Sequence, residues 1–371
     1  MELLDAFGNP ASPAMITPQG FNLSLWPDAD KQRLIKDDLE KVTVWESAFG
    51  NFFGEYHEMA NNWRMIVDNR GRKGFPVAKT SETTRATNTL ASLEYRMLTA
   101  ADPYVEARAE GLKEDGTEAT ESELYATERV LMRQNQVLKF KKKLLRGIRS
   151  GKLFGTAIFE CPFVSTPYHS LSKSFEGTDL VLRPLIQFGF DPYCYDIELS
   201  DYVFTVDYVS KFRLLQMAQG QDSIWDLGAV NEAIGDQESG KASRDFSTNV
   251  YNQINQRKQR AGYQENAKDV YEVVTMHGFS DINNPLVRAF WDSTGSQDDP
   301  GMVHFTRSFI NGKNLARFHV TPYGNWRHLF KIASMNEFEL EPIGYGVGRL
   351  GKRAQIQLDA TQSRMDALMK M

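Results

Sequence analysis

The chain has 371 residues, of which 41% are hydrophobic and 25% charged, and its formal net charge is −5 at pH 7. Such values are typical of a globular protein of two or three domains, and they exclude a disordered chain. The weak negative charge excludes a protein that is basic over its whole surface, so any contact with DNA must be local.

The cysteine content and the N-terminus indicate a reducing, cytosol-like environment. The two cysteines, Cys161 and Cys194, are too few for a disulfide-stabilised fold, and each is interpreted as a small buried apolar residue. The N-terminus lacks the basic segment and apolar core of a secretory signal. The sequence also has no apolar run near the ~18 residues that a membrane helix needs, so we expect no membrane contact.

The first part of the chain is predicted to be mainly helical. Residues 1–27, rich in proline and glycine, predict an extended arm. From an N-cap at Asp28 or Asp30, apolar residues recur every few positions as far as Trp63. This spacing predicts a long amphipathic helix or two nearly continuous helices.

Two further helices are predicted, over about 81–99 and 121–150, with a strand over 104–111 between them. The second of these carries a basic cluster, KFKKKLLRGIR, near its C-terminal end, where positive charge suits the helix dipole. The cluster is interpreted either as a solvated face or as a contact for DNA or an acidic neighbouring subunit.

The pattern changes after Gly151 to short segments rich in β-branched and aromatic residues. Strands are predicted within 151–164, 179–196 and 201–210, and a short helix follows. Residues 219–245 are polar and predict a loop or insertion. A polar, basic helix is predicted within 248–267.

A second β-rich block is predicted over 269–279, 286–293 and 302–320, with Asn311 and Gly312 at a hairpin turn. A final helix follows the segment PIGYGVG. The chain therefore belongs to the α+β class, with long amphipathic helices and two small β-rich blocks.

The stretch GVGRLGKR looks like two nucleotide-binding motifs at once, because Gly346, Gly348 and Gly351 fit G-x-G-x-x-G and Lys352 follows the last of them. A Rossmann motif needs a buried strand before it, whereas SMNEFELEP carries three glutamates and ends in proline. A P-loop needs a hydroxyl for magnesium where Arg353 stands. We therefore expect no cofactor at this stretch.

These glycines instead predict a flexible, close-packing joint between a β-rich region and a helix; the hinge set is Gly344, Gly346, Gly348 and Gly351. Lys352 and Arg353 open that helix, where positive charge opposes the dipole. The conflict predicts a compensating anion, either an acidic residue of a neighbouring subunit or DNA.

Catalytic and metal-binding patterns are lacking in the sequence. The six histidines are scattered, and HEMAN at 57–61 begins like a zinc-protease motif but ends in Asn61. No G-x-S-x-G or C-x-x-C motif occurs. We therefore expect no metal, no catalytic residue and no enzyme activity.

The last helix has three faces. At 100° per residue, an apolar stripe forms that is expected to pack: Leu350, Ala354, Leu358, Thr361, Met365 and Leu368. Arg349, Arg353 and Arg364 form a separate basic stripe beside it, and two aspartates lie on the far side. The pattern fits a surface helix with ion pairs, or a helix whose charged faces meet neighbouring subunits in a ring.

Four stretches, in their order along the chain, resemble one family. GFPVAKTSETTRATNTLASLEYRMLTAADPYVEARA resembles a helix that precedes an extended strand. LMRQNQVLKFKKKLLRGIRSGKLFGTAIFEC resembles a long helix, a glycine-bounded turn and a strand. VLRPLIQFGFDPYCYDIELSDYVFTVDYVSKFRLLQM is similar to a β segment, an Asp-Pro turn and a short helix. YGVGRLGKRAQIQLDATQSRMDAL resembles a glycine segment that leads into a tunnel helix. This order is similar to that of the portal (head–tail connector) proteins of tailed bacteriophages, especially short-tailed phages.

The resemblance implies a fold of wing, stem and clip, in a ring of about twelve subunits around a DNA channel. It places an N-terminal arm at 1–27, a wing at 28–245 and a first stem helix at 246–267. A clip-like region follows at 268–330, and a second stem segment with its helix at 331–371. A segment like the tunnel loop and C-terminal crown of portals is not found in the sequence given.

The resemblance also implies partners: double-stranded DNA passing without sequence specificity, the large terminase motor, the major capsid or scaffold protein, and a tail adaptor. The expected location is the portal vertex of the virion, after assembly in the host cytoplasm. Seven basic residues are expected to face the channel or another subunit: Arg257, Lys258, Arg260, Arg349, Lys352, Arg353 and Arg364.

Two alternative functions remain open from the sequence. One is a capsid or tail adaptor without a DNA channel. The other is a nucleotide-binding enzyme that uses Gly346–Arg353. The subunit number and the channel-facing residues are not fixed by the sequence.

Overall fold

The chain forms two compact units in the computed structural model. Unit 1 comprises Met1–Phe53 and Pro184–Leu329, and unit 2 comprises Gly54–Arg183 and Phe330–Met371. The structure describes residues 28–65, 81–100, 120–168, 173–219, 224–238, 254–259, 261–262, 270–281, 288, 302–321, 325–336 and 341–369.

Unit 1 is built on a five-stranded antiparallel sheet in the order β5-β6-β7-β8-β9. Its strands are β5 (Phe188–Phe190), β6 (Tyr202–Ser210), β7 (Val270–Asp281), β8 (Met302–Ile310) and β9 (Asn314–Val320). Its helices are α2 (Asp28–Ala48), α7 (Lys211–Gln219), α8 (Leu227–Glu238), α12 (Trp326–Leu329) and the 3₁₀ turns η2 (Leu185–Gln187) and η3 (Ile197–Leu199). Residues 254–259 are also helical.

Helices cover both faces of this sheet. Trp45 of α2 packs edge-on against Phe204 of β6, with ring centroids 5.3 Å apart. Buried residues of α7 and α8 form a core with Val273 of β7 and Ile310 of β8. Phe204 of β6 is paired with Met276 of β7, so these two side chains lie on the same face of the sheet. Met276 and Val273 are three positions apart on β7, and successive side chains of a strand point to opposite faces. The α2 side and the α7–α8 side are therefore opposite faces.

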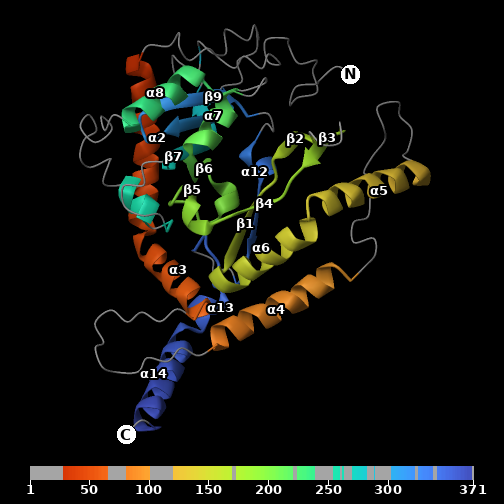
Figure 1. Cartoon of the computed structure of the whole chain (residues 1–371), viewed down its shortest axis with the longest axis vertical. Helices are drawn as coiled ribbons and strands as arrows, with labels where there is room; N and C mark the ends of the chain where they lie inside the picture. The colour runs from red at the N-terminus through yellow and green to blue at the C-terminus, as the bar shows by residue number, and fades with distance from the viewer. Residues whose placement is uncertain are drawn as a thin grey trace. The chain divides into compact units, whose positions relative to one another are not determined.

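Unit 2 combines helices with two small sheets. A three-stranded sheet has the order β10-β1-β4, and β2 pairs with β3. The strands are β1 (Thr156–Glu160), β2 (Phe163–Tyr168), β3 (Lys173–Thr178), β4 (Val181–Arg183) and β10 (Phe330–Ser334). The helices are α4 (Glu82–Leu98), α5 (Glu121–Val137), α6 (Phe140–Phe154), α13 (Val347–Leu350) and α14 (Lys352–Met369), while α3 (Gly50–Trp63) begins in unit 1 and continues into unit 2. Helices α4 and α6 lie side by side (Figure 1).

Several predictions from the sequence are confirmed. The fold is α+β. The segment from Asp28 to Trp63 forms two nearly continuous helices, α2 and α3, and the helix predicted over 81–99 is α4. Asn311 and Gly312 lie between β8 and β9 with φ of 49° and 67°, the left-handed backbone that a tight hairpin turn requires.

Three predictions about element boundaries are wrong. The single helix over 121–150 is broken between α5 and α6, where Lys139 is left-handed with φ of 54°. The second of these helices, α6, was predicted to end near Gly151 but continues to Phe154. It ends there because the next residue, Gly155, has a left-handed backbone. Residues 227–238 of the supposed loop form α8, which buries three apolar side chains in the unit 1 core.

The predicted division into wing and clip does not match the compact units. Strand β6 of the supposed wing pairs with β7 of the supposed clip along its full length, from Tyr202 opposite Gly278 to Ser210 opposite Val270. A continuous ladder of this kind places both in one sheet. The predicted arm at 1–27 and the strands at 104–111 and 286–293 lie outside the described residues, apart from Arg288, which is helical.

Candidate functional site

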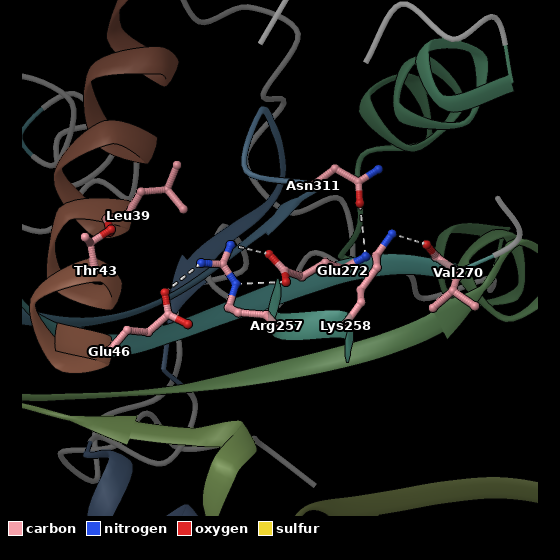
Figure 2. Close-up of polar contacts among 8 residues, drawn as sticks. All are labelled: Leu39, Thr43, Glu46, Arg257, Lys258, Val270, Glu272 and Asn311. Atoms are coloured by element: carbon pink, nitrogen blue, oxygen red, sulfur yellow. Dashed lines mark hydrogen bonds and ion pairs between the residues drawn. The ribbon is translucent and has the colours of Figure 1, made fainter. Parts of the chain in front are cut away.

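Arg257 lies at the centre of a buried charge cluster in unit 1 (Figure 2). Its side chain is 5% exposed. The guanidinium donates two hydrogen bonds to Glu272, from Nε to Oε2 at 2.9 Å and from Nη2 to Oε1 at 2.7 Å. A third bond runs from Nη1 to Oε2 of Glu46 on α2, at 3.1 Å. One guanidinium thus joins α2, the 254–259 helix and β7.

The carboxylates of this cluster compensate the buried positive charge of Arg257. Burial lowers the pKa of Arg257, but the carboxylates of Glu272 and Glu46 outweigh burial and hold that pKa above its ordinary value. Glu272 is 0% exposed, so its carboxylate depends on the paired arginine for compensation. The two parallel hydrogen bonds to Glu272 are the bidentate arrangement in which an arginine binds a carboxylate most strongly.

Backbone contacts tie the cluster to the β8–β9 hairpin. The backbone N–H of Glu272 donates to Oδ1 of Asn311 at 3.0 Å, and the N–H of Asn311 donates to the carbonyl of Glu272 at 2.8 Å. Lys258 donates from Nζ to the carbonyl of Val270 at 2.7 Å (Figure 2). Burial lowers the pKa of Lys258, and Glu272 opposes that shift. Asn311, which the sequence predicts in a hairpin turn, therefore belongs to the charge cluster.

These contacts correct the role predicted for two basic residues. Arg257 and Lys258 are both buried within unit 1, so neither side chain faces a channel or another subunit in this structure. The prediction was wrong because the two partners, Glu272 and the Val270 carbonyl, cannot be recognised from the helix sequence. Arg260 lies outside the described residues.

The predicted glycine joint lies where three backbone segments of unit 2 cross. A Cβ at Gly344 would stand 2.3 Å from the carbonyl oxygen of Met335, and one at Gly346 would stand 2.3 Å from that of Leu153. A Cβ at Gly348 would meet the same Leu153 oxygen at 2.8 Å. Backbones can approach this closely only without side chains, so the close-packing part of the prediction is confirmed. Gly351 differs, since its nearest neighbour is the carbonyl of its own helical turn.

Five backbone N–H groups of this stretch have acceptors within the chain. The N–H of Gly344 donates to Oγ1 of Thr156 at 2.9 Å, and that of Tyr345 donates to the carbonyl of Met335 at 2.8 Å. The N–H groups of Arg349, Leu350 and Gly351 donate to the carbonyls of Gly346 and Val347. A phosphate cradle needs backbone N–H groups that point at the ligand, so these five groups are not available for one.

The compensating anions for the basic residues of this stretch come from the same chain. Lys352 Nζ lies 2.8 Å from Oε2 of Glu58, and this hydrogen bond raises the pKa of Lys352. Arg349 lies 3.2 Å from Glu55 through Nε and 3.0 Å from Glu341 through Nη1. All of these residues belong to unit 2. The prediction that a neighbouring subunit or DNA supplies the anion is therefore wrong for Lys352.

The faces of α14 are arranged differently from the expectation. The apolar stripe is open to solvent, with Met365 51% and Leu368 70% exposed. The residue that packs is Gln355, whose Oε1 accepts hydrogen bonds from the N–H and the hydroxyl of Thr83 at 3.2 Å and 2.8 Å. Arg353 and Arg364 are exposed, so these two remain available to DNA or to another chain.

The described residues contain neither a metal-binding cluster nor a membrane-spanning helix. Among the residues that the structure describes, no group of three or more histidine, cysteine, aspartate or glutamate side chains could hold a metal ion. No helix in the described ranges is both long enough and apolar enough to span a bilayer. Both cysteines are free and half-buried, and burial raises the pKa of the Cys194 thiol to about 11.

Comparison with known proteins gives no family: no protein-family model matches the chain, and no curated protein matches it significantly.

Proposed function

We propose that the chain is a non-enzymatic subunit of a portal-like ring, which conducts double-stranded DNA at a capsid vertex during packaging and ejection. The exposed stripe of α14 carries this proposal. An apolar row along an 18-residue helix is unfavourable in water, and such a row on a helix is typical of a surface that another chain covers.

The charges beside the stripe support a ring rather than a two-fold dimer. Arg353 and Arg364 lie on one side of the stripe, and Asp359 and Asp366 lie on the other. A helix with unlike flanks can place its basic side against the acidic side of the next copy. Repeated head-to-tail contacts form a closed ring when the rotation from one copy to the next is a whole fraction of a full turn.

Few exposed basic residues on α14 also suit the passage of DNA. Each phosphate that a protein neutralises adds salt-dependent affinity, and many such contacts would hold the duplex in place. With Arg349 and Lys352 engaged by glutamates, Arg353 and Arg364 are the predicted channel residues that remain exposed in the part of the chain that the structure describes. By the resemblance of its segments, the ring would meet a terminase motor, the capsid or scaffold protein and a tail adaptor.

The size of the purified protein tests the proposal. Light scattering and negative-stain images should give rings of about a dozen subunits around a hole wider than duplex DNA, about 20 Å. Leu358→Ser with Met365→Ser should shift the protein towards smaller species. Leu227→Ser, which changes an exposed leucine on α8, is the matched control and should leave the ring intact.

Two outcomes would count against a DNA conduit. A stable monomer or dimer at high concentration would overturn the ring. A ring with a hole too narrow for the duplex would favour an adaptor without a channel. If the α14 variant forms rings as well as the control does, the stripe is not the subunit contact.

A further inference from the structure

A chain of polar side chains runs through the buried part of the unit 1 sheet. Nδ1 of His304 on β8 lies 2.7 Å from Oγ1 of Thr321, which lies 3.0 Å from Oγ1 of Thr306. Thr306 in turn lies 3.1 Å from Nδ1 of His277 on β7. At the other end, the backbone N–H of Trp326 donates to Nε2 of His304 at 3.2 Å. All five residues are buried.

The donor at one end fixes the position of the proton on His304. Nε2 of His304 accepts an N–H, so the imidazole must carry its proton on Nδ1, which donates to Thr321. Thr321 also lies within hydrogen-bond distance of Thr306, which in turn contacts His277. The bond from Trp326 requires the His304 imidazole to be neutral, because an imidazolium has no acceptor.

The surroundings of His304 offer an imidazolium little support. Burial and the nearby guanidinium of Arg307 lower the pKa of His304 to about 4. The Arg307 guanidinium lies 3.0 Å from both oxygens of Asp38 on α2, so that carboxylate is already engaged. Other titratable or charged groups on the neighbouring elements include Glu272, His277 and Asp281 of β7, Arg317 and His319 of β9, and Arg327 and His328 of α12.

Trp326 is the residue that this network holds. It is the first residue of α12 and is 1% exposed. Its indole Nε1 donates to the carbonyl of Ser200 at 3.2 Å, which ties α12 to the turn before β6. Four residues later, at Phe330, the chain leaves unit 1. The bond to His304 therefore anchors the segment through which the chain leaves the sheet.

We propose that His304 is an acid-sensitive latch on Trp326, which releases residues 325–329 from the sheet when its imidazole takes up a proton. A proton on Nε2 removes the acceptor of the Trp326 N–H and leaves an unpaired donor beside a buried charge. Opening the segment relieves both, because water can then reach the imidazole. This device is independent of whether the protein forms a ring.

Hydrogen exchange of the 325–330 backbone tests the latch on the full chain. After correction for the intrinsic rate, the opening of this segment in the wild-type protein should rise on the order of tenfold or more between pH 7.5 and 4.5. His304→Gln should abolish most of that rise. His328→Gln, at an exposed position of the same helix, is the matched control and should keep the rise.

A wild-type segment with no rise, or a His304→Gln variant with the full rise, would overturn the proposal. A second pair of variants keeps the test decisive if His304→Gln does not fold. Thr321→Val removes the acceptor of the Nδ1–H while keeping the side-chain shape, so it should increase exchange at 325–330 already at pH 7.5. Thr321→Ser keeps the hydroxyl and should not, and equal exchange in the two would contradict the network.

Discussion

The ammonium of Lys352 lies 2.8 Å from the carboxylate of Glu58. Lys352 is the first residue of α14, where a positive charge opposes the helix dipole, and Glu58 belongs to α3. Arg349, one turn earlier, is held by Glu55 of the same helix at 3.2 Å. Helix α3 thus places two carboxylates at the start of α14, and the sequence feature that looked like a phosphate motif is an intramolecular ion-pair site.

We expect the Lys352–Glu58 pair to be weak and sensitive to salt. Both side chains are partly exposed, and exposed pairs contribute about 0–1 kcal/mol. A double-mutant cycle with Lys352→Ala and Glu58→Gln, measured by urea unfolding, should give a coupling free energy in that range that shrinks at high salt. A coupling above about 3 kcal/mol would require a buried pair.

The same variant tests the nucleotide reading. Titration of the wild-type protein with ATP or NAD should show no saturable binding, because Arg353 stands where a P-loop needs a hydroxyl and the N–H groups of Arg349, Leu350 and Gly351 already have acceptors. Saturable binding that Lys352→Ala removes would contradict this and would revive an enzyme function at Gly346–Arg353.

Local signals in the sequence predicted local structure well. The turn at Asn311 and Gly312 was recognisable because the two residues themselves favour the left-handed backbone. The break at Lys139 was not, since neither glycine nor proline marks it. The joint at Gly346 was recognised from its glycines, although the segments that press against it, at Leu153 and Met335, come from elsewhere in the chain.

Long-range contacts decided what the sequence could not. Arg257 binds the carboxylate of Glu272, 15 residues away, and that of Glu46, 211 residues away. The position of Arg257 on its helix therefore could not predict that its side chain is buried. For α14, periodicity identified the apolar stripe but gave the wrong environment for it, because the stripe is open to solvent in this chain. Periodicity is the same for a buried stripe and for an exposed one, so it could not distinguish the two.

Removing the Arg257 guanidinium should destabilise the protein strongly. Arg257→Ala leaves the fully buried carboxylate of Glu272 without a partner, and breaking a buried pair in this way typically costs about 3–5 kcal/mol. Urea unfolding should therefore give a large drop in the midpoint. Arg213→Ala, at an exposed position of α7, is the matched control and should change stability by less than about 0.5 kcal/mol. Similar midpoints for the two variants would mean that the cluster is not buried in solution.

Two glycine substitutions should change the stability of the protein in opposite directions. Gly155 has φ of 95°, and a Cβ there would stand 1.9 Å from the carbonyl oxygen of Gly344. Gly155→Ala therefore combines backbone strain with a clash, and it should destabilise the protein by more than about 2 kcal/mol. Gly54→Ala, in α3, has no atom within 4 Å of the new Cβ and should stabilise the helix by about 0.5–1 kcal/mol. Thermal unfolding of the two variants would decide, and a tolerated Gly155→Ala would contradict the close approach.

Acid should destabilise unit 1 through its buried histidines. Burial lowers the pKa of His304 to about 4, and that of His319 also lies well below its ordinary value of 6.5. The folded protein therefore binds fewer protons than the unfolded chain, so its stability falls as the pH drops below 6.5 and the loss from His304 levels off near pH 4. From pH 7.5 to pH 5, His304 alone should cost about 2 kcal/mol. Urea unfolding at the two pH values should show that His304→Gln loses less stability than the wild-type protein by this amount, while His328→Gln loses as much as the wild type. If His304→Gln loses as much stability as the wild-type protein, the imidazole is not held neutral by the fold.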